Sequence, residues 1–356
     1  MAIGIITDES IHSIISKITT IHFRFDITEN PLVKFLTIKY FTIPFRNLPL
    51  PNPVNPIRLE HCDKRLDATE IAALRMNPID CAGRFLDLSR PCVMGVLNVT
   101  PDSFSDGGDY FGVAPALRRA ERMVEEGADL LDIGGESTRP GATPVSAREE
   151  IARVVPVIEA LAPRVPVPIS IDTSKPEVMR AAVSVGAGMI NDVRTLRRPG
   201  ALEAAVAAGV PVCLMHMQGE PGTMQEAPTY HDVVSEIRDF LRRRIEVCID
   251  AGMAPNRIII DPGFGFGKTL AHNLTLLAGL GELCSLGPPV LVGLSRKSMI
   301  GTLTGRPVAE RLAGCLAASV LAVERGARLV RVHDVAATVD ALRVAWAVHN
   351  LGPPER

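Results

Sequence analysis

The chain of 356 residues has almost no net charge, because 38 basic residues stand against 40 acidic residues. Proteins that bind nucleic acid or anionic membranes through a global field carry a basic excess, so we expect neither partner here. Any anion site must instead be built locally. No apolar run is long enough to cross a bilayer. The N-terminal residues MAIGIITDES lack a basic region and a small-residue cleavage site, so we expect no secretory signal.

Cysteine pairs that would suggest a disulfide framework or a metal site are also missing. The seven cysteines are an odd number and include no C-x-x-C pair, and no H-E-x-x-H motif is present. Several of the cysteines lie in apolar runs, where the thiol serves as a small core residue. We therefore expect reduced thiols and a cytoplasmic location.

Alanine and glycine are nearly absent from the first part of the chain and abundant in the rest. Up to residue 66, Ala2 is the only alanine and Gly4 the only glycine, and residues 44–58 are rich in proline. Such a segment suits an extended linker. We divide the chain into an atypical N-terminal extension, 1–75, and a main domain, 76–356. The extension is either genuine or the result of an upstream start site, and we favour the second interpretation, with Met76 as initiator.

The main domain alternates apolar strand-like runs with helical patterns. The runs are continuous, as expected for parallel strands whose two faces are both covered. Ser146 with Glu149 predicts a helix start, and Thr173 or Ser174 is expected to cap the next helix. Eight runs with intervening helices predict an α/β fold, a (β/α)8 TIM barrel, and a doubly wound open sheet is the alternative. The eight expected strands are 93–97, 129–134, 167–172, 188–192, 210–215, 257–261, 290–294 and 328–333.

Each of these runs carries a polar side chain at or near its carboxyl end. In a (β/α)8 barrel the loops that follow the strands form the active face, so these side chains would form one ring. A lone Asp or Asn after a strand is usually a cap or a turn. Caps do not require a lysine, an arginine and a histidine as well. The ring comprises Asn98, Asp132, Asp172, Asn191, His216, Asp261, Lys297 and His333, with Arg331 beside the last.

Three segments that carry side chains of this polar ring indicate two kinds of ligand, an anion and a flat aromatic molecule. In DIGGESTRPGA, Thr138 and Arg139 supply a hydroxyl and a guanidinium suited to phosphate. In DPGFGFGK, Pro262 stands where a phosphate-binding Walker loop needs glycine. The cationic groups of Lys297 and the R-V-H sequence at 331–333 would form an anion pocket. No nucleophile is paired with a base, so we expect a site that positions substrates and stabilises a departing anion.

Eight motifs in order make the chain resemble the bacterial dihydropteroate synthases. They are NVTPDSFSDGG, DIGGESTRPGA, IDTSKPEV, INDVR, LMHMQGEPGTMQ, DPGFGFGK, GLSRKS and RVHDV, within residues 85–350. The resemblance implies a transferase of folate biosynthesis that condenses 6-hydroxymethyl-7,8-dihydropterin pyrophosphate with 4-aminobenzoate. It also implies Mg²⁺, a homodimer and inhibition by sulfonamides.

The resemblance assigns roles to matching residues. Asp172, Asn191, Asp261 and Lys297 would hold the pterin. Asn98, Thr138, Arg139, Arg331 and His333 would bind pyrophosphate, with Asn98 as the protein ligand of Mg²⁺. Phe104, Asp106, Pro140, Phe266 and Ser298 would border the aminobenzoate. Of these, Lys297, Asp261, Arg331, His333 and Asp106 are the residues expected to take part in catalysis. Asp132 is expected to support the loop of Thr138 and Arg139, and His216 to shape the floor.

Two alternatives remain at this stage. The first is a pterin-binding methyltransferase barrel, which would not need the combination of Thr138, Arg139, Lys297, Arg331 and His333. The second is a paralogue that binds pterin without catalysis, against which the intact Asn98, Thr138, Lys297 and His333 argue.

Overall fold

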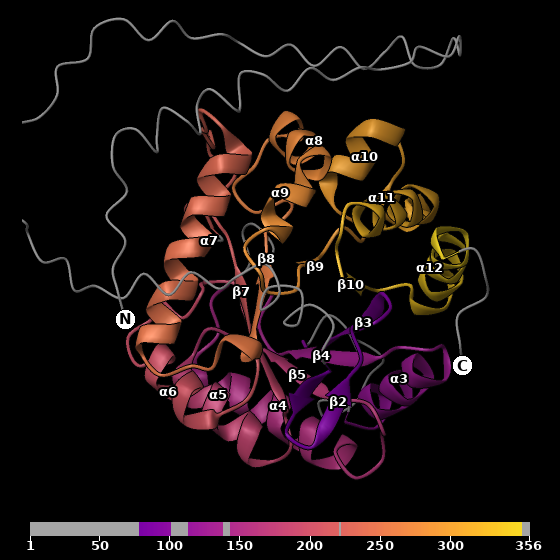
Figure 1. The fold of residues 1–356 in the computed structure, drawn as a ribbon. Coiled ribbons are helices and arrows are strands. Elements are labelled where there is room, and N and C mark those ends of the chain that lie inside the picture. The colour runs from indigo at the N-terminus through magenta and orange to yellow at the C-terminus, as the bar shows by residue number, and fades with distance from the viewer. Residues whose placement is uncertain (1–77, 101–112, 138–142, 221, 351–356) are drawn as a thin grey trace, which may run out of the picture. The chain divides into compact units, whose positions relative to one another are not determined.

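A computed structural model describes residues 78–100, 113–137, 143–220 and 222–350 of the chain. These residues form a barrel of parallel strands inside a ring of helices (Figure 1). The predicted residues Phe104, Asp106, Thr138, Arg139 and Pro140, and the extension 1–75, lie outside the described residues.

The sheet has eight parallel strands in the order β8-β7-β6-β5-β4-β3-β10-β9. A parallel bridge between Ile260 and Val290 joins the two ends, so the sheet closes. This closure confirms the predicted (β/α)8 barrel and excludes the open-sheet alternative. The strands are β3 (Cys92–Asn98), β4 (Leu130–Gly134), β5 (Ile169–Asp172), β6 (Met189–Asp192), β7 (Val212–Met215), β8 (Ile258–Asp261), β9 (Leu291–Val292) and β10 (Leu329–Val332).

Helices cover the outside of the barrel and bury one apolar core cluster against the strands. The helices are α3 (Val113–Glu125), α4 (Ala147–Leu161), α5 (Pro176–Ser184), α6 (Ala201–Ala208), α7 (Val233–Asp250), α8 (Leu270–Ala278), α9 (Leu280–Cys284), α10 (Ser298–Thr304), α11 (Leu312–Glu324) and α12 (Val335–His349), with short 3-10 turns at Pro255–Arg257 and Val308–Glu310. In the part of the chain that the structure describes, no helix is long and apolar enough to cross a membrane.

A second apolar cluster fills the barrel interior at the amino ends of the strands. A short antiparallel hairpin, β1 (Ile79–Cys81) and β2 (Arg84–Leu86), contributes Ile79, Cys81 and Leu86 to it. Strand residues such as Met94 and Leu329 complete the cluster. Because the hairpin precedes β3 and joins this cluster, the amino end of the barrel is packed with side chains. Chemistry is therefore confined to the opposite rim.

The two predicted helix starts have different outcomes. The Ser146 hydroxyl accepts a hydrogen bond from the Glu149 N–H at 3.2 Å and caps α4, as predicted. The predicted cap of α5 is wrong, because Lys175 is the N-cap and makes no side-chain cap bond. The Ser174 hydroxyl instead donates to Asp192 at the end of the neighbouring strand β6. A hydrogen bond from a hydroxyl to a buried carboxylate is stronger than one between a hydroxyl and a neutral backbone N–H. The Ser174 hydroxyl therefore makes the tertiary contact instead of capping α5.

Candidate active site at the carboxyl rim

Strand alternation places the polar ring directly above the apolar floor of the barrel. Side chains two residues apart on a strand point to the same face. Four strand residues of the second apolar cluster are therefore followed, two positions later, by an inward polar residue. The pairs are Leu130 and Asp132, Met189 and Asn191, Ile259 and Asp261, and Leu329 and Arg331.

The guanidinium of Arg331 joins two carboxylates from neighbouring strands. Its Nε donates to Asp132 Oδ2 at 2.6 Å, and one terminal nitrogen donates to Asp172 Oδ2 at 2.7 Å. The Asn191 amide also donates to Asp132 Oδ2, at 3.1 Å. Four side chains from four strands thus form one connected polar network. Arg331 is 22% exposed while Asp132 has no exposed surface, so the network opens toward the rim through the arginine.

Burial and pairing set the charges of this network. Burial raises the pKa of Asp172 to about 7, although the nearby Arg331 opposes this rise. Burial alone would lower the pKa of Arg331, but Asp132 and Asp172 together raise it above its usual value. Arg331 therefore stays charged, and Asp172 can change its protonation near neutral pH. Asp132 Oδ1 is buried and has no hydrogen-bond partner among the described atoms, so the network retains an unused acceptor.

The second half of the ring lies around Asp261 at the end of β8. Its Oδ1 accepts a hydrogen bond from the Gly263 N–H at 2.7 Å. Gly263 has a φ of +70°, and a Cβ there would lie 1.9 Å from the His216 carbonyl oxygen, so only glycine fits. Burial raises the pKa of Asp261 to about 6, while the Gly263 hydrogen bond and Lys297 oppose the rise.

Lys297 faces the same region from the start of α10. Its Nζ lies 4.1 Å from the centre of the Phe266 ring, a cation–π distance. Burial lowers the pKa of Lys297 to about 8, although Asp261 opposes the fall. Asp261, Phe266 and Lys297 therefore lie together at the rim and combine a carboxylate, an aromatic face and an ammonium. Ser298, the next residue, is exposed at the first position of α10.

His333 follows β10 and is held by its neighbours. Its Nδ1 lies 3.0 Å from the Ser295 hydroxyl oxygen, which also accepts the His333 backbone N–H at 3.3 Å. Arg119 on α3 donates to the His333 carbonyl oxygen at 3.0 Å. These contacts fix the backbone and the ring of His333 two residues after Arg331.

A buried ion network lies behind the loop that follows β4. The Lys175 ammonium contacts Glu136 Oε2 at 2.7 Å and also pairs with Glu150, which has no exposed surface. Glu136 Oε1 accepts the Val145 N–H at 2.9 Å. Glu136 and Val145 stand on either side of the segment that carries Thr138 and Arg139. This network ties the two described ends of that segment together.

The structure brings together six of the predicted residues. The Asp132 carboxylate binds Arg331 and Asn191, while the segment of Thr138 and Arg139 that Asp132 was expected to support lies outside the described residues. His216 contributes its Nδ1 to a buried lysine, Lys268, at 3.0 Å. Sequence reasoning missed Lys268, although it ends the glycine-rich segment and could have been noted as a lysine in an apolar setting. The assembled residues are Asp172, Asn191, Asp261, Lys297, Arg331 and Phe266.

Asn98 ends β3 at the rim and faces a space that glycine leaves open. A Cβ added at Gly134 would lie 3.7 Å from Asn98 Oδ1 and 3.8 Å from Asp172 Oδ2. Among the described residues no group of three or more His, Cys, Asp or Glu side chains gathers to hold a metal. The amide oxygen of Asn98 as a single protein ligand fits Mg²⁺, which usually takes one or two protein oxygens and completes its shell with water and substrate phosphate.

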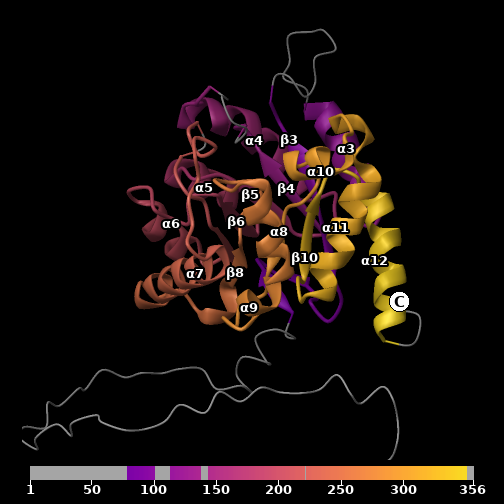
Figure 2. The same ribbon diagram turned by 90° about the horizontal axis from the view of Figure 1, so that it is seen from above.

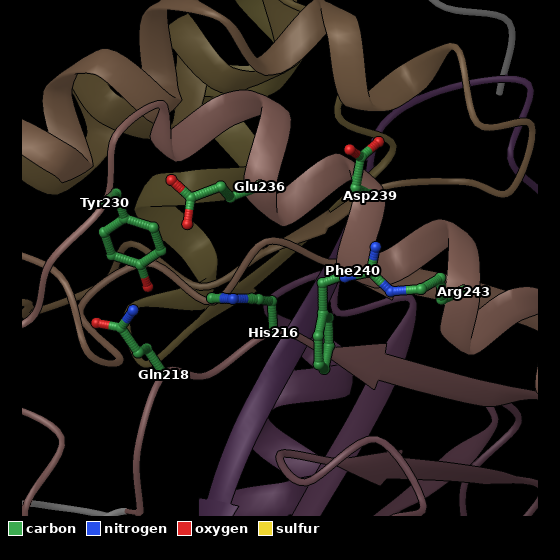
Figure 3. A pocket seen from close by; sticks show the side chains of 7 residues that line it. All are labelled: His216, Gln218, Tyr230, Glu236, Asp239, Phe240 and Arg243. Carbon is green, nitrogen blue, oxygen red and sulfur yellow. The ribbon is translucent and has the colours of Figure 1, made fainter.

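A cavity of about 300 Å³ lies between His216 and helix α7. Its lining includes the rings of His216, Tyr230 and Phe240 (Figure 3). The residues of the polar ring other than His216 do not line this cavity. The reaction site assembled above is therefore distinct from it.

Comparison with known proteins identifies the family of this barrel. Residues 94–333 match the model of the pterin binding enzymes. The chain is 56% identical over 265 residues to the dihydropteroate synthase of Escherichia coli K12, which covers 74% of this chain and 94% of that relative. It also resembles the solved Xanthomonas albilineans dihydropteroate synthase in complex with 7,8-dihydropteroate, with a TM-score of 0.71, 57% identity and coverage of 77% of this chain and 99% of that one. A Yersinia pestis dihydropteroate synthase with a sulfonamide drug complex gives a TM-score of 0.73 at 53% identity, covering 77% and 100% of the two chains.

Proposed function

This chain belongs to the family of pterin-binding enzymes, and we propose how its rim residues divide the work of the reaction. The enzyme is a transferase that condenses 6-hydroxymethyl-7,8-dihydropterin pyrophosphate with 4-aminobenzoate and releases 7,8-dihydropteroate and pyrophosphate. The observation that carries the assignment is the network of Arg331, Asp132, Asp172 and Asn191 beside Asp261 and Lys297.

The pterin is held by Asp172, Asn191, Asp261 and Lys297. A pterin edge presents N–H donors next to ring-nitrogen and carbonyl acceptors. The carboxylates of Asp172 and Asp261 accept from such donors, and Lys297 donates to such acceptors. A buried polar pocket of this kind discriminates by roughly 10⁴-fold against an analogue that lacks the matching groups. The low exposure of Asn191 and Asp261 supports this role.

The pyrophosphate is held by Arg331 and His333, together with Asn98, Thr138 and Arg139. Arg331 keeps its charge at neutral pH because two carboxylates raise its pKa. A guanidinium that is fixed by carboxylates on one side presents its remaining N–H groups in a defined direction. Asn98 would hold Mg²⁺, and the bound ion would neutralise charge on the leaving pyrophosphate. The open space at Gly134 between Asn98 and Asp172 supports this assignment.

The aminobenzoate lies against Phe266, with Phe104, Asp106, Pro140 and Ser298 as further neighbours. The Phe266 ring offers an apolar face for the benzene ring. The Lys297 ammonium lies over the same Phe266 ring. The region proposed for the aminobenzoate therefore adjoins the region proposed for the pterin, which supports the placement. The arylamine is neutral and nucleophilic at pH 7, so strong general-base help is not required. Asp106 orients the arylamine or accepts its proton.

The reaction exchanges one bond at the methylene carbon of the pterin substrate. The bond from this carbon to the pyrophosphate oxygen breaks, and pyrophosphate leaves with the electron pair. The amine nitrogen forms the new bond to carbon and loses one proton. Because the electron-rich pterin delocalises positive charge, bond breaking can run ahead of attack. Arg331 and His333 stabilise the negative charge that grows on pyrophosphate.

A steady-state assay of pyrophosphate release, with and without 4-aminobenzoate, tests this function. Release that requires 4-aminobenzoate and produces dihydropteroate is expected, and a sulfonamide should compete with 4-aminobenzoate. A methyltransferase or a non-catalytic pterin binder would release no pyrophosphate, and that result would reject the proposal. A sulfonamide that inhibits without competing against 4-aminobenzoate would reject the assigned aminobenzoate region.

A homodimer is supported by the outer face of the last two long helices. These helices, α11 and α12, lie side by side (Figure 2). They expose Leu312, Leu321, Val344 and Val348, whose exposed fractions range from 42% to 71%. Val344 and Val348 are four residues apart and share one face of α12, and exposed apolar side chains gathered on one face often mark an interface. A cytoplasmic location is supported by five buried cysteines among the described residues that form no disulfide, Cys81, Cys92, Cys213, Cys248 and Cys315.

A further inference from the structure

We propose that Lys268 is a positioning residue, which holds the glycine-rich segment 262–267 so that Asp261 and Phe266 keep their orientation toward the substrates. The inference rests on the proposed function, because it names what sets the shape of that same site. Lys268 is not a member of the polar ring, and its hydrogen bonds within the described residues go to His216, Gly263 and Phe266.

The ammonium of Lys268 is buried and fully hydrogen-bonded. The residue is 3% exposed. Its Nζ lies 3.0 Å from His216 Nδ1, 2.9 Å from the Gly263 carbonyl oxygen and 3.0 Å from the Phe266 carbonyl oxygen. A lysine ammonium has three N–H donors, so these three acceptors satisfy it completely. Burial lowers the pKa of Lys268 to about 7, although Asp261 opposes the fall, so the ammonium is present below that value. In that form a buried group with all its partners satisfied strongly specifies the geometry around it.

His216 acts in this arrangement as a fixed neutral acceptor. Burial, with Lys268 and Arg197 nearby, lowers the pKa of His216 to about 2, so the ring is neutral. Because the Lys268 ammonium can only donate, Nδ1 is the ring nitrogen that carries no proton. The Phe240 ring meets the His216 ring edge to face with centres 4.9 Å apart, and the Tyr230 ring lies 6.1 Å away on the other side (Figure 3). These rings hold the imidazole in place, and the imidazole directs Lys268.

The two backbone acceptors of Lys268 belong to the residues that shape the site. Gly263 donates its N–H to Asp261 Oδ1, and its carbonyl oxygen accepts from Lys268 and from the Phe266 N–H at 3.1 Å. Phe266 carries the ring that faces Lys297, and its carbonyl oxygen accepts from Lys268. One ammonium therefore fixes both the backbone next to the pterin carboxylate and the backbone next to the aminobenzoate wall.

The segment needs such a clamp because its backbone is irregular. Gly263, Gly265 and Gly267 all have positive φ, from +59° to +77°, so no helix or strand organises it. Two further carbonyl groups of the segment accept hydrogen bonds from different partners. Gln225 donates to the Gly265 carbonyl at 2.6 Å, and the Tyr230 hydroxyl donates to the Gly267 carbonyl at 2.9 Å. Lys268 alone binds the carbonyls of Gly263 and Phe266 from a side chain among the described residues.

Lys268 also affects the charge of Asp261. The groups that lower the pKa of Asp261 against its burial include the Gly263 N–H, Lys297, Lys268 and Arg331. Removal of the Lys268 charge leaves Asp261 easier to protonate. The acid limb of the pH profile of kcat/KM for the pterin substrate then moves to higher pH. A loss of folded protein alone would not cause this shift.

The test compares Lys268→Met with Tyr230→Phe in the full-length enzyme. Lys268→Met keeps the length and the apolar stem but removes the charge and the three donors. Tyr230→Phe removes one hydrogen bond to the same segment and leaves the contacts of Lys268 in place.

We expect Lys268→Met to raise the KM of both substrates about tenfold or more, since small misplacements in a site are costly. Its acid limb should move up by roughly half a pH unit. Tyr230→Phe should leave both KM values and the limb near those of the wild type.

A merely structural role gives a different result, because partial unfolding lowers kcat per total protein without changing either KM. Unchanged KM values and an unmoved acid limb in Lys268→Met would overturn the inference. If Lys268→Met lacks a cooperative melting transition, Lys268→Gln, which keeps two donors without the charge, is measured against the same outcomes. A wild-type enzyme without 4-aminobenzoate-dependent pyrophosphate release would instead overturn the proposed function.

Discussion

Arg331 and Asp132 form a buried pair, with Nε and Oδ2 separated by 2.6 Å, across the neighbouring strands β10, β3 and β4 of the barrel. The same guanidinium reaches Asp172 with a second nitrogen at 2.7 Å. An arginine held by two carboxylates has lost most of its freedom to rotate. The pair therefore presents the remaining N–H groups of Arg331 toward the rim in one direction.

The Asp132→Asn substitution tests this pair. The variant keeps the shape of the side chain but removes the charge that fixes Arg331. We expect kcat/KM to fall by about 100-fold, because a misdirected guanidinium no longer matches the leaving group. The free energy of unfolding should fall by about 3 kcal/mol, as for other broken buried pairs. Steady-state kinetics and urea unfolding provide the two values. An unchanged kcat/KM would show that Arg331 needs no support from Asp132.

The Lys297→Ala substitution separates function from folding. Lys297 is the N-cap of α10 but makes no side-chain cap bond, so its removal should leave the melting temperature nearly unchanged. We expect kcat/KM to fall by about 100-fold or more through loss of a charged donor to the substrate. Arg306→Ala is the control, since Arg306 makes an exposed ion pair with Glu310 at 2.9 Å, and such pairs contribute little. Near-normal turnover of the Lys297 variant would contradict the assigned role.

The pH dependence of kcat/KM for the pterin substrate should be bell-shaped. Burial raises the pKa values of Asp261 to about 6 and of Asp172 to about 7, so protonation removes their acceptor charge as the pH falls through this range. Burial lowers the pKa of Lys297 to about 8, so its charge is lost as the pH rises above that value. Lys297→Arg should remove the limb near pH 8, whereas a fall set by Lys268, whose pKa burial lowers to about 7, should remain. If a limb near pH 8 persists in this variant, a group other than Lys297 causes that limb.

Removal of Mg²⁺ should abolish turnover, because pyrophosphate is a poor leaving group until its charge is neutralised. Dialysis against a chelator, followed by the assay of pyrophosphate release, provides the test. Added Mg²⁺ should restore the rate. The Asn98→Ala variant should require a higher Mg²⁺ concentration for half-maximal rate. Full activity after chelation, with no metal in the sample by elemental analysis, would contradict the proposed role of the ion.

The barrel and most of its polar ring could be predicted from the sequence. Each buried parallel strand is a continuous apolar run, and the residue that ends it must lie at one rim. Asp172, Asn191, Asp261 and Arg331 were identified in this way. Strand order and closure follow from connection rules rather than from any one residue, so they needed no further information.

The partners of these residues could not be predicted. Asp132 and Arg331 are far apart in the chain, and nothing local shows that their side chains meet. Ser174 was expected to cap a helix, but a carboxylate on the next strand takes its hydroxyl. Lys268 lies in a segment whose glycines allow many backbone conformations, so its acceptors become apparent only when the segment is folded around it. Long-range pairing of polar groups decided each of these cases.

The division of the rim into a pterin half and a pyrophosphate half is tested most directly by binding of the separate fragments. Calorimetry would measure the Kd of 6-hydroxymethylpterin and of Mg²⁺ pyrophosphate for the wild type, Asp261→Asn and His333→Ala. We expect Asp261→Asn to weaken pterin binding by about tenfold or more while pyrophosphate binding is kept, and His333→Ala to do the reverse. Equal weakening of both fragments in both variants would contradict the division.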